Sequence, residues 1–133
     1  MGTILIVDDS EMVRERLKNL LHGKHTLFMA ENGEKGLEAY IQHKPVDLVI
    51  TDLNMPVMNG IKMCSEIIEL EKKKSPPIIV ISSEADSRMN TQLKSLGVVA
   101  RIIKPFKDST FCSVVERMFK YVGKVKKGDN GDS

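Results

Sequence analysis

The 133-residue sequence predicts an α/β fold: a single doubly wound, five-stranded parallel sheet of strand order 2-1-3-4-5 with five helices. Two observations support this prediction. Five short apolar runs, rich in Ile and Val, alternate along the chain with five segments whose apolar residues recur at helical spacing. Strict alternation favours right-handed crossovers, which make the strands parallel and cover both faces of the sheet with helices.

The first half of the chain contains three predicted strands and two helices. The strand Ile4–Val7 is purely apolar, as expected of a central strand, and Ser10 begins the first helix as its cap. The run Leu27–Ala30 is less informative and fits an edge strand. Asn32-Gly33 turns the chain into the second helix, and the apolar strand Leu48–Ile50 follows it. The two helices carry their apolar residues at Val13, Leu17, Leu20 and Leu21, then at Leu37, Tyr40 and Ile41.

The second half continues with two strands and three helices. Pro76-Pro77 ends the third helix before the apolar strand Ile78–Ile81, and the last strand is expected at Ile102–Ile103. The apolar positions of the three helices again have helical spacing. They are Ile61, Cys64, Ile67 and Ile68, then Met89, Leu93 and Leu96, then Phe111, Val115, Met118, Phe119 and Val122.

Length and composition fit one domain. With 41% hydrophobic and 29% charged residues, the chain can bury one core but has no room for a second folded domain. The segment after Val122 has almost no apolar residues and many turn formers, so it adds little to a core. We expect a domain over residues 1–122 and a flexible C-terminal tail over residues 123–133.

Charge and hydropathy argue against two classes of partner. The net charge is only +2, from 20 basic and 18 acidic residues, so we expect no direct binding to nucleic acid. No apolar stretch reaches the roughly 18 residues of a membrane span, so we expect no membrane insertion. The N-terminal run Thr3–Val7 is too short for a signal peptide, and we expect a cytoplasmic protein.

Polar side chains end four of the predicted strands. The carboxyl ends of parallel strands lie at one edge of the sheet, where doubly wound folds bind their ligands. An isolated aspartate could simply cap the helix after its strand, but three aspartates with a hydroxyl and an amine indicate a functional site. The residues in question are Asp8 and Asp9, Thr51 and Asp52, Ser82 and Ser83, and Lys104 with Pro105.

This set of side chains suits magnesium and phosphoryl chemistry. Carboxylates that lie together repel one another unless a cation offsets their charge, and oxygen ligands without His or Cys favour Mg²⁺ over zinc. A carboxylate nucleophile can then form an acyl phosphate while other donors hold the phosphoryl oxygens. Asp52 is the best-placed nucleophile because its strand lies between the strands that lead to Asp8 and to Ser82. Lys104 supplies a positive charge.

These segments resemble the receiver domains of two-component response regulators, and the likeness extends from Thr3 to about Val122. The resemblance implies a flavodoxin-like (CheY-like) fold and a phosphorylation-activated receiver of a two-component phosphorelay. Four motifs carry the likeness: Ile4-Leu-Ile-Val-Asp-Asp-Ser10, Leu48-Val-Ile-Thr-Asp-Leu-Asn-Met-Pro-Val-Met-Asn-Gly60, Val80-Ile-Ser-Ser-Glu-Ala85 and Ile103-Lys-Pro-Phe106.

The resemblance implies that Asp52 accepts a phosphoryl group from a histidine kinase, a phosphotransfer protein or a small phosphodonor. The domain would then signal to a downstream protein target through protein contacts. Mg²⁺, or Mn²⁺ in its place, would be held by Asp9, Asp52 and the backbone carbonyl of Asn54, with Asp8 acting mainly through water. The chain would be a phosphoacceptor rather than an enzyme, apart from self-catalysed phosphorylation and dephosphorylation.

The resemblance also assigns roles around the acceptor. Ser82 would be the switch hydroxyl that moves toward the phosphoryl group, and Lys104 would pair with that group in the activated state. Pro105 would follow through a cis peptide bond, and Gly60 would let the loop after the acceptor turn closely.

Two further positions bear on the lifetime of the phosphoryl group. Asn54 and Glu84 stand two residues beyond Asp52 and Ser82, where family members tune the lifetime of the acyl phosphate. Both are polar and could position an attacking water molecule. We therefore predict a short-lived phosphorylated state.

Arg101 departs from the family pattern. Many receivers carry Tyr or Phe three residues before the lysine, and the ring swings inward on activation. Inward rotation of an arginine without a partner is costly. Arg101 is therefore either an exposed residue that deters edge pairing of the last strand, or a contact residue of a partner surface formed by the fourth helix, the fifth strand and the fifth helix.

Three other functions remain as alternatives. A haloacid-dehalogenase phosphatase also uses an aspartyl phosphate, but it requires Asp-x-Asp after its first strand, whereas Asp8 and Asp9 are adjacent. A flavodoxin cradles a flavin phosphate after its first strand, where these two aspartates would repel it. A receiver without phosphorylation would serve only as a docking surface, although every residue type of the acceptor site is present.

Overall fold

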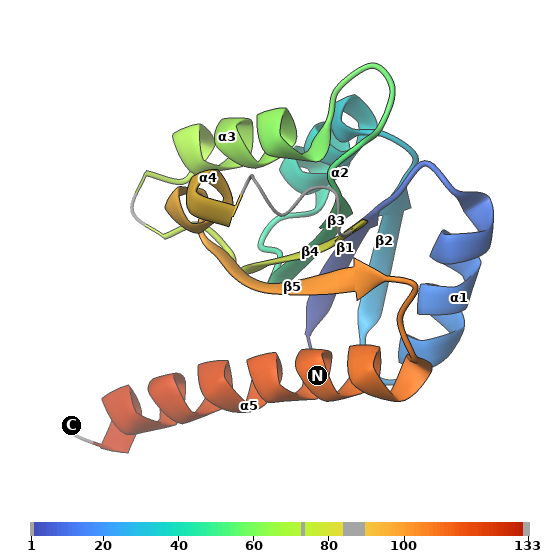
Figure 1. Cartoon of the computed structure of the whole chain (residues 1–133). Coiled ribbons are helices and arrows are strands. Elements are labelled where there is room, and N and C mark those ends of the chain that lie inside the picture. Colours follow the sequence, from blue (N-terminus) through green and yellow to red (C-terminus); the bar gives the residue numbers. More distant parts are fainter. Residues whose placement is uncertain (1, 73, 84–89, 132–133) are drawn as a thin grey trace.

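A computed structural model of the chain describes residues 2–72, 74–83 and 90–131. Over these residues it confirms the predicted fold, a parallel five-stranded sheet with five helices (Figure 1). In chain order the elements are β1 (Thr3–Val7), α1 (Glu11–Leu21), β2 (Thr26–Ala30), α2 (Gly33–His43), β3 (Leu48–Asp52), α3 (Gly60–Leu70), β4 (Ile78–Ser83), α4 (Asn90–Ser95), β5 (Val98–Lys104) and α5 (Asp108–Gly131).

The strand order is β2-β1-β3-β4-β5, and all neighbouring strands are parallel, as predicted. β2 is an edge strand. The register pairs Val7 with Thr51, so the residues after β1 lie level with the end of β3. On the other side of β3, Asp52 pairs with Ile81, which puts Ser82 one residue further along β4. The carboxyl ends of three adjacent strands therefore meet at one place.

The sheet separates two hydrophobic cores. Ile6 and Ile50 belong to the core that also contains residues of α1 and α5, whereas Val7 and Val49 belong to the core with residues of α2, α3 and α4. Figure 1 shows the same division, with α1 and α5 on one face of the sheet and the other helices opposite. Because apolar packing covers both faces, the central strands hold their end residues in fixed positions.

Side-chain caps set the start of three helices near this edge of the sheet. Ser10 caps α1, as the sequence predicted. Asn32, predicted only as part of the turn into the second helix, caps α2, and Asn59, for which nothing was predicted, caps α3. Each side chain accepts a hydrogen bond from a backbone N–H three residues further on, which satisfies one of the free donors of the first turn.

Two elements at the C-terminal end are longer than the sequence suggested. β5 begins at Val98, four residues before the predicted Ile102, because Arg101 interrupts the apolar run in the sequence. α5 continues to Gly131 through the segment expected to be a flexible tail from residue 123, and its last turns project beyond the sheet (Figure 1). The division at residue 122 stays a prediction. Within the described residues no helix has the length and apolar character needed to cross a membrane.

Candidate functional site

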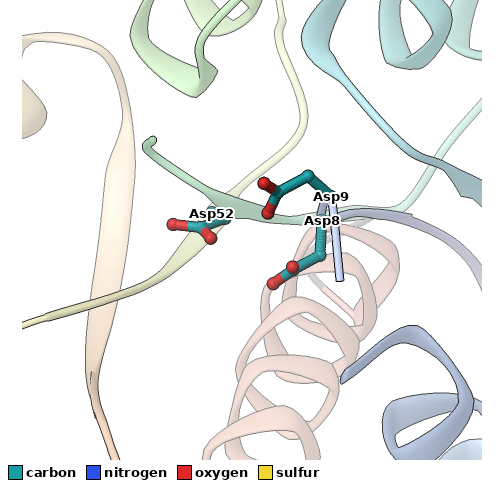
Figure 2. Close-up of side chains that lie close together, drawn as sticks. All are labelled: Asp8, Asp9 and Asp52. Atoms are coloured by element: carbon teal, nitrogen blue, oxygen red, sulfur yellow. The ribbon is translucent and has the colours of Figure 1, made fainter. Parts of the chain in front are cut away.

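Three carboxylates meet where β1 and β3 end. One oxygen each of Asp8, Asp9 and Asp52 lies within 4.8 Å of the other two (Figure 2). Asp8 and Asp52 are buried, at 2% and 8% exposure, whereas Asp9 faces solvent. The structure thus brings together the three aspartates that the sequence predicted as neighbours. The cluster is therefore open to solvent on the side of Asp9.

Lys104, at the end of β5, lies between the two buried carboxylates. Its Nζ donates to Oδ2 of Asp52 at 3.0 Å and to Oδ2 of Asp8 at 3.4 Å. The ammonium group therefore partly offsets the negative charge of the cluster. The Lys104-Pro105 peptide bond is cis, as predicted.

Burial and charge act in opposite directions at this site. Burial raises the pKa of Asp8 above its ordinary value; the hydrogen bond from the Ser10 N–H and the Lys104 charge oppose the rise, and the Asp52 charge adds to it. For Lys104, burial alone would lower the pKa, but the hydrogen bond to Asp52 and the negative charges of both aspartates outweigh it and raise the pKa. Lys104 thus keeps its positive charge at neutral pH.

Backbone donors hold the Asp52 side chain from the other direction. Oδ1 accepts from the N–H of Leu53 at 2.7 Å and from the N–H of Asn54 at 3.3 Å. The following loop returns close to β3, since the Gly60 N–H donates to the Leu53 carbonyl at 3.0 Å. A Cβ on Gly60 would lie 2.2 Å from the Asp52 carbonyl oxygen, so only glycine fits this close approach.

Ser82 and Arg101 form a contact that the sequence did not predict. The Ser82 side chain is buried at the end of β4, and its Oγ accepts a hydrogen bond from Nε of Arg101 at 2.9 Å. Nη2 of Arg101 donates to the Ser83 carbonyl at 2.7 Å. Arg101 is half-buried, and neither of its predicted roles included this contact.

The remaining predicted residues are only partly located. Asn54 is exposed in the loop after Asp52. Glu84 lies outside the described residues. The roles assigned to these residues stay predictions.

Two arginines of α1 support the site through the backbone, and no sequence motif indicated them. Arg14 donates from Nη1 to the Asp8 carbonyl. Arg16 donates to the Phe106 carbonyl and to the Asp108 carboxylate, both at 2.7 Å, and its guanidinium lies 4.1 Å from the centre of the Phe106 ring. The segments that follow β1 and β5 are therefore both tied to α1.

The donor set fits a hard divalent cation. Its side-chain ligands are oxygens only, and carboxylate oxygens are what Mg²⁺ takes up alongside water and phosphate. One ammonium group is not enough to offset three carboxylates. The arrangement therefore combines an acidic cluster able to hold a metal with a buried carboxylate beside a lysine and a serine.

Comparison with known proteins gives a consistent result. The family model of the response regulator receiver domain matches residues 4–116. The protein CcdB of Bacillus subtilis is 30% identical over 120 residues, which cover 89% of this chain and 98% of CcdB. A chemotaxis protein CheY homolog of Campylobacter jejuni is 35% identical over 106 residues, covering 77% of this chain and 81% of its own.

A longer relative and two solved structures extend this pattern. The sensor histidine kinase TmoS of Ectopseudomonas mendocina is 34% identical over 103 residues, but the chain spans only 10% of that protein. The structure is similar to Vibrio cholerae CheY4, with a TM-score of 0.80 and 26% identity over 89% of this chain and 98% of that one. The signal receiver domain of a histidine kinase from Syntrophus aciditrophicus matches with a TM-score of 0.78 and 29% identity, over 92% of each chain.

Proposed function

The chain belongs to the response regulator receiver family, and on that premise we propose that Asp52 is its site of phosphorylation. The family makes it a phosphorylation-activated receiver of two-component signalling. One observation supports Asp52 above the other carboxylates. Asp52 is itself the last residue of the central strand β3, it pairs with Ile81 directly before Ser82, and its Oδ2 accepts from Lys104 at 3.0 Å, against 3.4 Å for Asp8.

The reaction proposed for Asp52 is a phosphoryl transfer. A carboxylate oxygen attacks phosphorus, an O–P bond forms, and the bond between phosphorus and the donor breaks. The donor is a phosphohistidine of a kinase or phosphotransfer protein, or a small acyl phosphate, and it keeps the electron pair of the broken bond. Lys104 then neutralises charge on the phosphoryl oxygens and Ser82 donates a hydrogen bond to one of them.

The proposed cofactor is Mg²⁺, with Mn²⁺ as a substitute. Asp9, Asp52 and the backbone carbonyl of Asn54 would hold it directly, and Asp8 mainly through water. When bound, the ion offsets the charge that develops on the phosphoryl oxygens. The acidic cluster supports this assignment, since its oxygens lie close enough to share one ion.

We further propose that the domain acts through protein contacts and does not turn over a substrate. A histidine kinase or phosphotransfer protein would supply the phosphoryl group. A downstream target would bind the face formed by α4, β5 and α5, where Val99 and Ile103 are exposed. Asn54 and Glu84 would keep the phosphorylated state short-lived, so a signal that persisted for many hours in native buffer would contradict their role.

The central experiment is incubation with acetyl phosphate and Mg²⁺, followed by measurement of the intact mass. We expect one phosphoryl adduct on the wild type and none on Asp52→Asn. Glu69→Gln is the matched control, because it removes an exposed carboxylate of α3 that is not part of the acidic cluster, and it should label like the wild type. Absence of an adduct on the wild type, or an equal adduct on Asp52→Asn, would refute the proposal.

A further inference from the structure

Arg101 is joined to the proposed phosphoryl site by two hydrogen bonds. It lies on β5 opposite Val80, and its guanidinium reaches along the sheet to the end of β4. There Nε bonds to Oγ of Ser82 and Nη2 bonds to the carbonyl of Ser83, the next residue. One planar group thus holds two adjacent residues of the neighbouring strand.

The direction of the Ser82 contact follows from chemistry. A guanidinium has only donors, so the Ser82 oxygen must be the acceptor, and the Ser82 proton cannot point toward Arg101. Ser82 is 1% exposed, so little water is available to take that proton. Among the described residues, the Ser82 hydroxyl donates no hydrogen bond. The proton is thus kept available for an acceptor that arrives at the site.

The sheet register places that acceptor. Ser82 is the residue directly after Ile81, and Ile81 pairs with Asp52. A phosphoryl group on Asp52 would bring oxygens that accept hydrogen bonds strongly because they are charged. An oxygen that already accepts from a cation also becomes a better donor, since hydrogen bonds in a chain polarise one another.

We propose that Arg101 is a positioning residue for phosphoryl transfer: it fixes the Ser82 oxygen as an acceptor and so directs the Ser82 proton to a phosphoryl oxygen on Asp52. This inference rests on the proposed phosphorylation of Asp52. It assigns Arg101 a role that neither edge protection nor partner contact would require. The fork geometry matters as well as the charge, because a lysine has a single ammonium group that cannot hold both oxygens in the same way.

The test is a double-mutant cycle on the rate constant of phosphoryl uptake from acetyl phosphate with Mg²⁺. Arg101→Met keeps a side chain of similar length and removes every donor. We expect it to slow uptake about tenfold in the wild-type background, the size of one charge-assisted hydrogen bond. In the Ser82→Ala background we expect Arg101→Met to have little effect, because the residue through which it acts is missing.

Two controls separate positioning from charge and from general damage. Arg101→Lys keeps the charge and should recover only part of the rate, and it also serves if Arg101→Met does not fold. Arg117→Met removes an exposed arginine of α5 and should label like the wild type. Thermal unfolding of each variant verifies that the fold is retained.

The outcomes are distinct. An unchanged or faster uptake in Arg101→Met, an equal loss in the Ser82→Ala background, or full recovery by Arg101→Lys would overturn the positioning role. In each of these cases the wild type still forms the adduct, so the proposed function stands. Failure of the wild type to form any adduct would instead overturn the proposed function.

Discussion

Val57 has a positive φ of 70° in the loop between Asp52 and α3, and the Met58 N–H bonds back to the Pro56 carbonyl at 2.8 Å. This is a three-residue turn with a φ that is strained for a β-branched residue. The side chain is 75% exposed and contributes little packing. The loop after the proposed acceptor therefore stores strain at a residue that solvent and partners can reach.

Relief of this strain should stabilise the fold. We expect Val57→Gly to raise the free energy of unfolding by about 1 kcal/mol, since removal of the Cβ clash outweighs the added entropy of the unfolded chain. Val57→Ala is the control, because it removes the exposed side chain but keeps the Cβ and thus most of the strain. Urea unfolding measures both variants. Equal stability of Val57→Gly and Val57→Ala would show that the positive φ of Val57 is not strained.

Ionisation of Asp8 should lower the free energy of unfolding. Its pKa is raised by burial, so the folded state binds its proton more tightly than the unfolded state does. The resulting stabilisation is full below about pH 3.8 and is lost as the pH rises through the raised pKa. At neutral pH the ionised carboxylate is a net cost of folding.

We therefore expect Asp8→Asn to raise the free energy of unfolding by about 1 kcal/mol at pH 7 without divalent metal, since the amide still accepts from the Ser10 N–H. The gain should shrink as the pH falls toward 4. It should also shrink with Mg²⁺, which the wild type binds better. Urea unfolding over this pH range gives the measurement, and a variant less stable than the wild type at pH 7 would count against it.

Some side-chain positions could be predicted from sequence and others could not. Asp8, Asp52 and Lys104 follow from topology, because residues that directly end neighbouring parallel strands must lie together. The contacts of Arg16 and Arg101 depend on long side chains whose rotamers no pattern specifies. The sequence therefore located the groups of the candidate site but missed the arginines that hold them.

At the scale of elements, a histidine links the start of β1 to α5. Nδ1 of His25 accepts from the Gly2 N–H at 3.1 Å, and its ring stacks on Phe119 with 4.5 Å between centroids. The accepting nitrogen must be unprotonated. Burial lowers the pKa of His25, with the Lys24 charge acting in the same direction and Asp47 opposing it.

Mild acid should therefore weaken this link. The folded-state pKa lies below the ordinary 6.5, so the stabilisation is full above about pH 6.5 and is lost as the pH falls through the lowered pKa. Between pH 8 and pH 5, we expect the free energy of unfolding to fall further in the wild type than in His25→Gln. The difference should be less than about 1 kcal/mol, because the ring is partly solvated. Chemical unfolding at several pH values tests this. Parallel pH curves for the two proteins would argue against a titrating link.

The elements themselves differ in how well sequence predicts them. Central strands such as β1 and β4 are unmistakable, because burial on both faces demands a continuous apolar run. In the edge strand β5, Arg101 separates the apolar residues Val98–Ala100 from Ile102 and Ile103, so only Ile102–Ile103 stood out. α5 extends to Gly131 through a segment with three glycines after residue 122, so composition alone does not mark the end of the helix.

For the whole molecule, metal binding should act as a stabilising ligand of the folded state. At a Mg²⁺ concentration about 100 times its dissociation constant, we expect the free energy of unfolding to rise by about 2.7 kcal/mol. Asp9→Asn should lose most of this gain, and its exposed side chain makes the substitution mild for the fold itself. Glu69→Gln, an exposed carboxylate of α3, is the control and should keep the gain. Thermal unfolding at constant ionic strength would give the comparison, and equal gains in both variants would exclude Asp9 as a ligand.

The position of Lys104 between two carboxylates affects the electrostatic field that the molecule presents to a distant partner. Counted as formal charges, the three aspartates and Lys104 give the site a net charge of two negative units. A divalent ion cancels them, and conversion of one carboxylate to an acyl phosphate of about two negative charges then adds back only about one. Metal loading thus alters the long-range field more than phosphorylation does. Partners should therefore distinguish the two phosphorylation states by the local shape of the surface. Their association rates should depend little on the phosphoryl group, and their dissociation rates should depend on it strongly.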